Sequence, residues 1–399
     1  MIQREIAPVL RSLFEKYPVV TVTGPRQSGK TTLCRATFPD LEYVNLERPD
    51  TRSFALEDPL GFLGRLKNGA VIDEIQRAPD LVSYIQVQVD EESRNGVFVL
   101  TGSRQFEVSE AISQSLAGRT GLLRLLPFTI SELERIRPGL DIDSLIYGGF
   151  YPRIYDQDIE PIQALGDYFE TYVERDVRQI GEIRQLTEFQ RFVRLCAGRT
   201  GQLLNLQSLG NDAGVSHTTA RRWMSILEAS YILFRLQPFH ANMNKRLIKA
   251  PKMYFYDVGL AAYLMGIENA SQILSHPLRG HLFENLVVVE ALKYRFNRGK
   301  RSNLLFFRDS SGFEVDLLCT QGMRFAAVEI KAAQTISRSF FSNLKKLRRL
   351  MPDRVAEEVL VHGGPAEYIR EGVKVTGPVG LAGLLAEWEA EEKAGGFSR

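Results

Sequence analysis

The stretch that decides the fold is Gly24-Pro25-Arg26-Gln27-Ser28-Gly29-Lys30-Thr31, which follows a β-branched run at residues 19–22 and precedes a helical pattern. It matches G-x-x-x-x-G-K-(S/T), a phosphate-binding loop between a strand and a helix. The glycines let backbone N–H groups converge on phosphate oxygens, Lys30 brings a positive charge to the β- and γ-phosphates, and Thr31 offers its hydroxyl to Mg²⁺. A glycine-rich turn without nucleotide is the alternative, and the flanking strand and helix argue against it. We therefore expect ATP and Mg²⁺ to bind at Gly24, Pro25, Arg26, Gln27, Ser28, Gly29, Lys30, Thr31 and Thr32.

A second motif supports this interpretation. The segment 69–76, GAVIDEIQ, is an apolar strand that ends in two adjacent carboxylates. We expect Asp73 to hold Mg²⁺ and Glu74 to orient the water that attacks the γ-phosphate. A third apolar run ends in the tetrapeptide Thr-Gly-Ser-Arg, and we assign Ser103 as the residue that senses the γ-phosphate. Polar residues after each strand place the site at the carboxyl edge of a parallel sheet.

Composition sets the class of the protein. The chain has 399 residues, of which 44% are hydrophobic and 25% charged, which is enough for two or three hydrophobic cores. Cys34, Cys196 and Cys319 have no disulfide or metal spacing, and the five histidines form no H-x-x-x-H pattern, which argues for a reducing compartment and against zinc. The N-terminus lacks a signal peptide pattern and no run of about 18 apolar residues occurs, so we expect a cytoplasmic protein that does not contact membranes. The net charge of +2 conceals local charge asymmetry.

Several motifs in a fixed order resemble one group of prokaryotic proteins. They are GPRQSGKTT, VIDEIQRAPDL, VLTGSRQF, SLAGRTGLLRLLPFTISEL and YGGFYP. The group consists of AAA-like P-loop ATPases with a C-terminal nuclease-like domain, and the resemblance extends from the first residues to about Lys331. It implies ATP hydrolysis, whereas most members of the group have no assigned role, so architecture and chemistry follow from it better than biology does.

Within the SLAGR motif, Arg119 is a candidate for the cation that stabilises the γ-phosphate during transfer. A guanidinium is always charged and spreads its charge over a plane, which suits phosphoryl transfer. Arg119 would act within its own subunit or across an interface with a second one. The alternative is an arginine in a structural salt bridge.

After the Gly-Pro turn at 147–152 the pattern becomes helical, with short helices predicted at 188–197, 206–213 and 218–229. The third helix and the strands predicted at 231–236 and 253–257 resemble a winged helix, with a basic wing between the strands. Hydroxyl and arginine side chains at the start of that helix suit phosphates and base edges, although such folds also serve as spacers or protein docks. The expected DNA contacts are Ser216, His217, Thr218, Arg221, Lys245 and Arg246.

The C-terminal third carries a second set of carboxylates. Glu284 lies early in an apolar helix, Asp316 lies in a strand, and Glu329 and Lys331 end another strand. Residues two apart in a strand share a face, so Glu329 and Lys331 project together toward Asp316. Asp316 and Glu329 suit Mg²⁺ or Mn²⁺, Lys331 suits the attacking water, and Glu284 completes the outer ligand set.

The order of these residues resembles that of the PD-(D/E)xK nucleases, and among them is most similar to archaeal Holliday junction resolvases. Val315 stands where the motif has proline, a change that does not affect the metal ligands. The resemblance implies a nuclease-like fold, and whether the site cleaves DNA is a separate question. A DNA- or protein-binding module on the same scaffold is the alternative.

We therefore predict an α/β multidomain chain: an AAA-like P-loop parallel sheet with a helical segment at residues 1–185, a winged-helix domain at 186–265, and a restriction-nuclease-like α/β domain at 266–399. The predicted function is ATP hydrolysis coupled to metal-dependent action on DNA, with branched or structured DNA as a candidate substrate. The alternatives are a switch that binds DNA or protein without cleavage, as in signalling or defence ATPases, and a toxin-like or helicase-loading partner protein. A homo-oligomer is compatible with the sequence.

Overall fold

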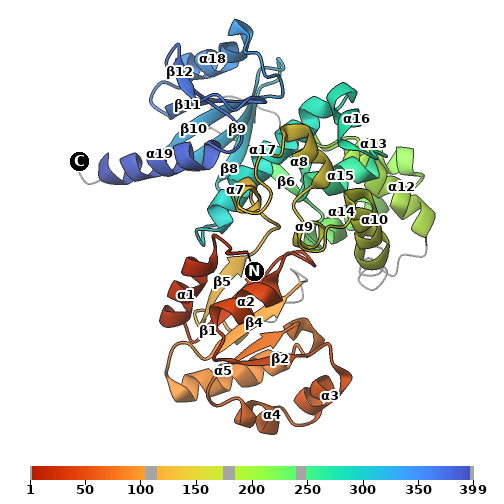
Figure 1. Cartoon of the computed structure of the whole chain (residues 1–399), viewed down its shortest axis with the longest axis vertical. Helices are drawn as coiled ribbons and strands as arrows, with labels where there is room; N and C mark the ends of the chain where they lie inside the picture. The colour runs from red at the N-terminus through yellow and green to blue at the C-terminus, as the bar shows by residue number, and fades with distance from the viewer. Residues whose placement is uncertain (1, 104–114, 174–184, 240–248, 396–399) are drawn as a thin grey trace.

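The computed structural model describes residues 2–103, 115–173, 185–239 and 249–395. The first third of the chain builds a parallel sheet in the order β2-β3-β4-β1-β5 (Figure 1). Its strands are β1 (Val19–Thr23), β2 (Glu42–Asn45), β3 (Ala70–Asp73), β4 (Phe98–Gly102) and β5 (Thr120–Arg124). Its helices are α1 (Ala7–Lys16), α2 (Lys30–Thr37), α3 (Pro49–Glu57), α4 (Pro59–Arg65), the 3₁₀ turn η1 (Ile75–Arg77) and α5 (Leu81–Glu92). The expected parallel sheet is confirmed, and the three apolar runs form β1, β3 and β4.

Strand β1 is an interior strand of this sheet. It lies between β4 and β5, and Val19 pairs with both Phe98 and Thr120. All residues of β1 and β4 are buried, as the continuous apolar pattern of strands covered on both faces requires. Because the strands are parallel, their carboxyl ends share one edge, and the chain leaves β1 at that edge to enter α2 at Lys30.

A group of short helices follows the sheet. Thr129 caps the first of them with a complete capping box, because its hydroxyl accepts from the backbone N–H of Glu132 while the Glu132 carboxylate accepts from that of Thr129. The group consists of α7 (Ile130–Glu134), α8 (Ile142–Gly148), α9 (Pro152–Asp156), α10 (Pro161–Tyr168) and a π-helical turn η2 (Phe169–Val173).

The middle of the chain contains the three helices that the sequence predicts. They are α12 (Leu186–Ala197), α13 (Leu206–Ala213) and α14 (His217–Ala229). Trp223 of α14 packs edge-on against Phe189 and Phe192 of α12, with ring centroids 5.4 and 5.5 Å apart. Leu209 and Ala213 of α13 belong to the same core. The elements that follow are β6 (Leu233–Pro238), β7 (Lys252–Phe255), α15 (Val258–Leu264) and α16 (Ala270–Ser275).

The two expected wing strands do not stand apart from the C-terminal region. They extend its mixed sheet, whose order is β12-β13-β11-β10-β9-β8-β6-β7, through a parallel pairing of Gln237 with Leu305 and Pro238 with Phe306. The sheet thus crosses the boundary that we expected at residue 265. The C-terminal elements are α17 (Arg279–Phe296), β8 (Leu304–Arg308), β9 (Glu314–Gln321), β10 (Arg324–Lys331), η3 (Arg338–Phe341), α18 (Ser342–Leu350), β11 (Val355–His362), β12 (Tyr368–Arg370), β13 (Val373–Thr376) and α19 (Leu381–Gly395).

Helix α17 lies at the centre of the molecule (Figure 1). Most of its residues are buried, as its apolar pattern on every face requires. One hydrophobic core runs from Leu126 to Trp388 and joins the short helices, the middle region and one face of the C-terminal sheet around α17. Among the described residues, no helix combines the length and the hydropathy needed to cross a membrane.

Candidate functional site

The phosphate-binding loop lies at the carboxyl edge of the parallel sheet, between β1 and α2. Gly24 and Gly29 have φ values of +152° and +90°, and a Cβ at Gly24 would lie 2.0 Å from the carbonyl oxygen of Leu125. Only glycine fits these positions. The Lys30 Nζ donates to the carbonyls of Gly24 and Pro25 at 3.1 and 2.8 Å, and burial lowers the pKa of this ammonium.

The Asp73 carboxylate accepts hydrogen bonds from three hydroxyl groups. Its Oδ2 accepts from the Thr31 Oγ1 at 2.8 Å and from the Tyr43 hydroxyl at 2.7 Å, and its Oδ1 accepts from Thr101. The two residues that we expected to share Mg²⁺ are thus in direct contact. Hard oxygens grouped beside the phosphate loop fit a magnesium ion bound together with a triphosphate. Thr101 belongs to the tetrapeptide that follows the third apolar run, whereas Tyr43 escaped the sequence analysis, because a hydroxyl alone carries no motif.

Glu74 and Ser103, the expected base and sensor, also lie together. The Ser103 hydroxyl donates to the Glu74 Oε2 at 3.2 Å, and the Gln76 amide nitrogen donates to both side chains, at 3.3 Å to Ser103. Glu74 adopts a left-handed backbone conformation, with φ of +59°, which turns its carboxylate out of the strand direction of β3. It lines the same cavity as Lys30.

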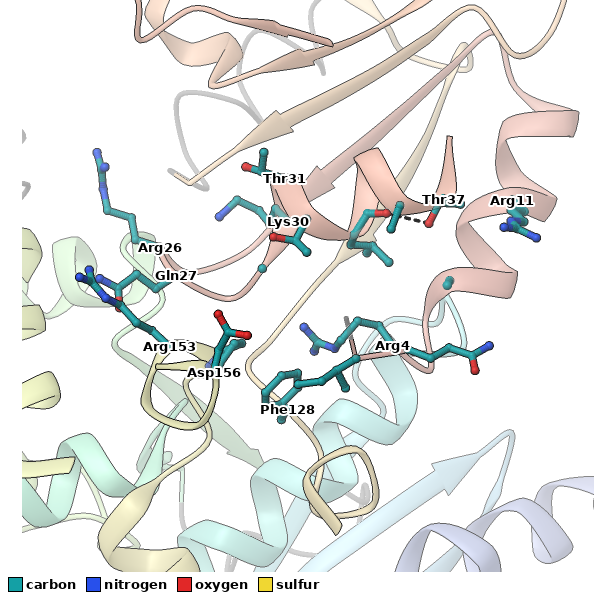
Figure 2. A pocket seen from close by; sticks show the side chains of 18 of the residues that line it. Arg4, Arg11, Arg26, Gln27, Lys30, Thr31, Thr37, Phe128, Arg153 and Asp156 are labelled. Atoms are coloured by element: carbon teal, nitrogen blue, oxygen red, sulfur yellow. Dashed lines mark hydrogen bonds between the residues drawn. The ribbon is translucent and has the colours of Figure 1, made fainter. Parts of the chain in front are cut away.

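That cavity has a volume of about 1140 Å³ and lies between the phosphate loop, the N-terminal segment and α9 (Figure 2). It adds residues that no motif indicated. The guanidinium of Arg153, on α9, has no partner among the described residues and faces the cavity that also contains Gln27 and Lys30. The other lining residues that the sequence analysis missed include Arg4, Arg11, Phe128, Asp156 and Gln157.

Arg119 does not reach this cavity. It directly precedes β5, and the pairing of Thr120 with Val19 places it at the amino end of β1, whereas the phosphate loop follows the carboxyl end. A strand of this length spans about 16 Å. Arg119 instead forms a two-pronged ion pair with Asp90, with Nε–Oδ1 and Nη2–Oδ2 distances of 2.6 and 2.9 Å. Its expected role toward the γ-phosphate of its own chain is therefore wrong, and a role across a subunit interface stays a prediction.

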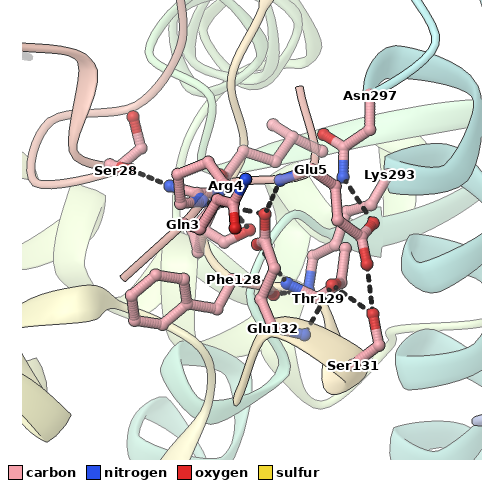
Figure 3. Close-up of polar contacts among 12 residues, drawn as sticks. Gln3, Arg4, Glu5, Ser28, Phe128, Thr129, Ser131, Glu132, Lys293 and Asn297 are labelled. Carbon is pink, nitrogen blue, oxygen red and sulfur yellow. Dashed lines mark hydrogen bonds and ion pairs between the residues drawn. The ribbon is translucent and has the colours of Figure 1, made fainter. Parts of the chain in front are cut away.

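The buried ion pair of Arg4 and Glu132 contacts the backbone of the phosphate loop (Figure 3). Arg4 donates through Nη1 to the carbonyl of Ser28 and through Nη2 to that of Leu126, both at 2.8 Å, and its Nε lies 3.0 Å from the Glu132 Oε1. The Arg4 and Glu132 side chains are 6% and 0% exposed. The same Glu132 oxygen accepts from the backbone N–H of Glu5 at 2.7 Å. Arg4 thus joins the loop to α7.

The residues around Arg4 also contact α17. The Lys293 ammonium donates to the Phe128 carbonyl at 2.6 Å and to the Glu290 Oε1 at 2.7 Å, and Glu290 accepts from the N–H of Ile130 at 2.9 Å. The Asn297 amide donates to the Glu5 carboxylate at 3.2 Å (Figure 3). A continuous set of polar contacts therefore connects the phosphate loop with the second half of α17.

The C-terminal carboxylates gather where β9, β10 and α17 meet. The Asp316 Oδ2 accepts from the N–H of Ile330 at 2.8 Å and lies 3.5 Å from the Lys331 Nζ, which is 2.7 Å from the Glu329 Oε1. The Asn343 amide donates to the same Glu329 oxygen at 3.3 Å. Burial, followed by the nearby Asp316 carboxylate, raises the pKa of Glu329. The structure thus brings together Asp316, Glu329 and Lys331.

Glu284 has partners that the sequence analysis missed. Its Oε1 accepts from the Lys252 ammonium at 2.8 Å and from the Tyr254 hydroxyl at 2.5 Å, and the Lys252 Nζ lies 2.5 Å from the Glu314 Oε1. Burial raises the pKa of Glu284 to about 7, against the effect of Lys252. We call Glu284, Glu314, Asp316 and Glu329 the acidic cluster. Among the described residues no group of three His, Cys, Asp or Glu side chains that could hold a metal ion is found, and the expected metal at Asp316 and Glu329 stays a prediction.

The expected DNA contacts divide into two groups. Ser216, Thr218 and Arg221 lie exposed at the start of α14, and His217 is half-buried there. The Ser216 hydroxyl caps the helix by accepting from the N–H of Thr219 at 3.1 Å. Lys245 and Arg246 lie outside the described residues.

Comparison with known families divides the chain into three parts. Residues 16–134 match the model of a family described as an AAA domain. Residues 139–271 and 279–380 match two families described as domains of unknown function, DUF8612 and DUF4143.

Among solved structures, the Walker-type ATPase PABY2304 of Pyrococcus abyssi is similar with a TM-score of 0.47 and 12% identity, over 66% of this chain and 96% of that one. AMPPCP-bound DnaA of Aquifex aeolicus gives a TM-score of 0.29 and 14% identity, over 56% and 85% of the two chains.

Relatives cover nearly the whole chain. The uncharacterized proteins Rv2008c of Mycobacterium tuberculosis and Mb2031c of Mycobacterium bovis are each 32% identical over 353 residues, which are 87% of this chain and 78% of theirs. The uncharacterized protein MJ1637 of Methanocaldococcus jannaschii is 22% identical over 88% of this chain and 83% of its own. The chain therefore belongs to the family of the mycobacterial proteins Rv2008c and Mb2031c, and its N-terminal third is an AAA-like P-loop ATPase domain.

Proposed function

We propose that this protein is an ATP-driven switch that acts on DNA, in which ATP binding and hydrolysis set the position of α17 and of the elements packed around it. The observation that carries the proposal is the set of buried contacts from the Ser28 carbonyl through Arg4 and Glu132 to α17. A triphosphate bound by the loop contacts the loop's own N–H groups, so a shift of this backbone acts directly on Arg4.

The chemistry of hydrolysis follows from the residues at the loop. Lys30 binds the β- and γ-phosphate oxygens, and Glu74 orients and polarises the attacking water, with Ser103 and Gln76 holding its carboxylate in place. Thr31 and Asp73 would hold a magnesium ion, which would supply positive charge beside the phosphates. Arg153 takes the role toward the γ-phosphate that Arg119 is too far away to fill.

A second contact supports coupling to the middle region. The hydroxyl of Tyr231, a fully buried residue between α14 and β6, donates to the Thr23 Oγ1 at 2.9 Å. Thr23 ends β1 and directly precedes Gly24. A change in the loop therefore has a short route to α14, whose exposed start carries Arg221.

The switch is tested by hydrogen exchange of the full chain with and without a slowly hydrolysed ATP analogue. We expect altered protection in α17 and at Tyr231 in the wild type, and no change in Lys30→Ala, which does not bind the analogue. An analogue that binds and leaves α17 and Tyr231 unchanged contradicts the proposal. Action on DNA is tested by fluorescence anisotropy across a salt series, where Arg221→Ala lowers the affinity and the salt slope, and the exposed Lys16→Ala, on α1, serves as the control.

A metal-dependent nuclease is the second candidate, and the sheet itself favours it. Helix α17 is followed by the antiparallel strands β8, β9 and β10, then by α18 and by β11, which pairs parallel with β10. Asp316, Glu329 and Lys331 lie on this framework in the order that the nuclease resemblance implies. Nicking of a labelled four-way junction, duplex or single strand with Mg²⁺ or Mn²⁺ by the wild type, lost in Lys331→Ala, would establish this activity.

A further inference from the structure

Lys252 is placed as the central cation of the acidic cluster. Its Nζ lies within 2.8 Å of Glu284 on α17 and within 2.5 Å of Glu314 on β9, so one ammonium joins carboxylates from two elements. The side chain is 3% exposed, and its ammonium lies 5.6 Å from the centre of the Phe306 ring. A lysine buried to this degree requires charged partners, because an unpaired ammonium is costly away from water.

The backbone fixes this position as firmly as the side-chain contacts do. Lys252 begins β7 and pairs with Leu236 of β6 on one side and with Leu203 on the other. The next residue, Met253, exchanges backbone hydrogen bonds with the 201–202 turn, which lies beside Glu284. Lys252 therefore enters the cluster because β7 is paired there, and cannot leave it without moving β7.

Most of the negative charge of the cluster is compensated from within the chain, by three cations for four carboxylates. The four carboxylates contact Lys252, Lys331 and Arg308, whose guanidinium lies 2.6 Å from the second oxygen of Glu314. A buried oxygen of Glu329, Oε2, has no partner in the described part of the chain. A divalent cation near that oxygen would stand close to the Lys331 ammonium, and the positive charge of Lys252 already acts on the neighbouring Asp316, so both lysines oppose its binding.

We propose that Lys252 and a divalent metal ion exclude one another from the acidic cluster, so that the cluster is closed to metal as long as β7 stays paired. Strand β7 belongs to the segment 139–271, and the other residues of the cluster lie beyond it. The middle region thereby controls access to the C-terminal carboxylates. This inference goes beyond the proposed ATP switch and does not depend on it, because it concerns the cluster without nucleotide.

The test is Mn²⁺ binding to the full, nucleotide-free chain, followed by electron paramagnetic resonance of free Mn²⁺. In the wild type, Asp316→Asn leaves Mn²⁺ binding unchanged, because the cluster takes no metal. Lys252→Met, which keeps the length of the side chain, gains one Mn²⁺ site that binds at least about tenfold more tightly than any site in the wild type. The gain disappears in Lys252→Met/Asp316→Asn, and Lys252→Arg, which retains the cation, shows no gain.

Two results overturn the inference. One is a loss of Mn²⁺ binding on Asp316→Asn in the wild-type background, since metal and Lys252 would then coexist. The other is a folded Lys252→Met chain that gains no site. If circular dichroism shows that Lys252→Met does not fold, the double variant Lys252→Met/Glu314→Gln, which removes one positive and one negative charge, replaces it. The comparison of Mn²⁺ binding between wild type and Asp316→Asn does not depend on either variant.

Discussion

The Arg4–Glu132 pair makes a quantitative prediction through Glu132→Gln, which keeps the shape of the side chain and removes its charge. Breaking one partner of a buried ion pair costs about 3–5 kcal/mol. Arg4 keeps the carbonyls of Ser28 and Leu126, and the glutamine retains one oxygen for a backbone N–H, so we expect the lower end, about 3 kcal/mol. For a unit of about 150–250 residues this loss lowers the Tm by about 6–12 °C.

Differential scanning calorimetry of the full chain without nucleotide measures this shift. The matched control is Glu134→Gln on the same helix, where the carboxylate is exposed and a change of about 0.5 kcal/mol or less is expected. The double variant Arg4→Met/Glu132→Gln loses less than the sum of the single variants, because no charge is then left unpaired. A Glu132→Gln chain as stable as the Glu134→Gln control would refute the account of Arg4 as the anchor of the phosphate loop.

Three further predictions concern catalysis and pH. Glu74→Gln retains ATP affinity and lowers the rate of hydrolysis by about 10²-fold or more, as measured by phosphate release against fluorescent nucleotide binding. Arg153→Ala lowers the rate of ATP hydrolysis by about 10³-fold, while Arg119→Ala leaves the rate of a dilute, monomeric sample unchanged. A loss of rate in Arg119→Ala and not in Arg153→Ala would assign the γ-phosphate role to Arg119. Burial and Asp316 raise the pKa of Glu329 from 4.5 to about 8, so the folded chain holds a proton that the unfolded chain releases, and stability falls as pH rises through that window. Glu329→Gln removes this fall, which thermal unfolding between pH 5 and pH 9 detects.

The nucleotide site could be predicted because its motifs are short, continuous stretches of sequence, and because the carboxyl ends of parallel strands meet at one edge of the sheet. The phosphate loop is a continuous motif, and parallel strands bring Thr31 and Asp73 to the same edge whatever the length of chain between them. The position of Arg119 could not be predicted in this way, because it depends on which end of β5 the residue occupies. Only the pairing of Thr120 with Val19 shows that Arg119 lies at the amino end. Arg4 has no motif at all, since its acceptors are backbone carbonyls.

The C-terminal cluster shows a different limit. The spacing of Glu329 and Lys331 within one strand placed them on one face, and the hairpin of β9 and β10 brought Asp316 to them. The partner of Glu284 was missed because Lys252 lies in a strand that the sequence assigns to another domain. A single lysine after a proline has no pattern that predicts burial, and the pairing of β6 with β8 that buries it is a tertiary event.

The two ends of α17 relate the nucleotide site to the acidic cluster. Glu290, Lys293 and Asn297 hold its second half to the elements around the phosphate loop, and Glu284 holds its first half to Lys252. Six residues of helix, about 9 Å, separate Glu284 from Glu290, and a buried helix transmits displacement along its axis with little loss. A shift of even about 1 Å at the loop end would stretch the 2.8 Å contact between Glu284 and Lys252 beyond hydrogen-bond length. The contact between Glu284 and Lys252 therefore links the position of α17 to the acidic cluster.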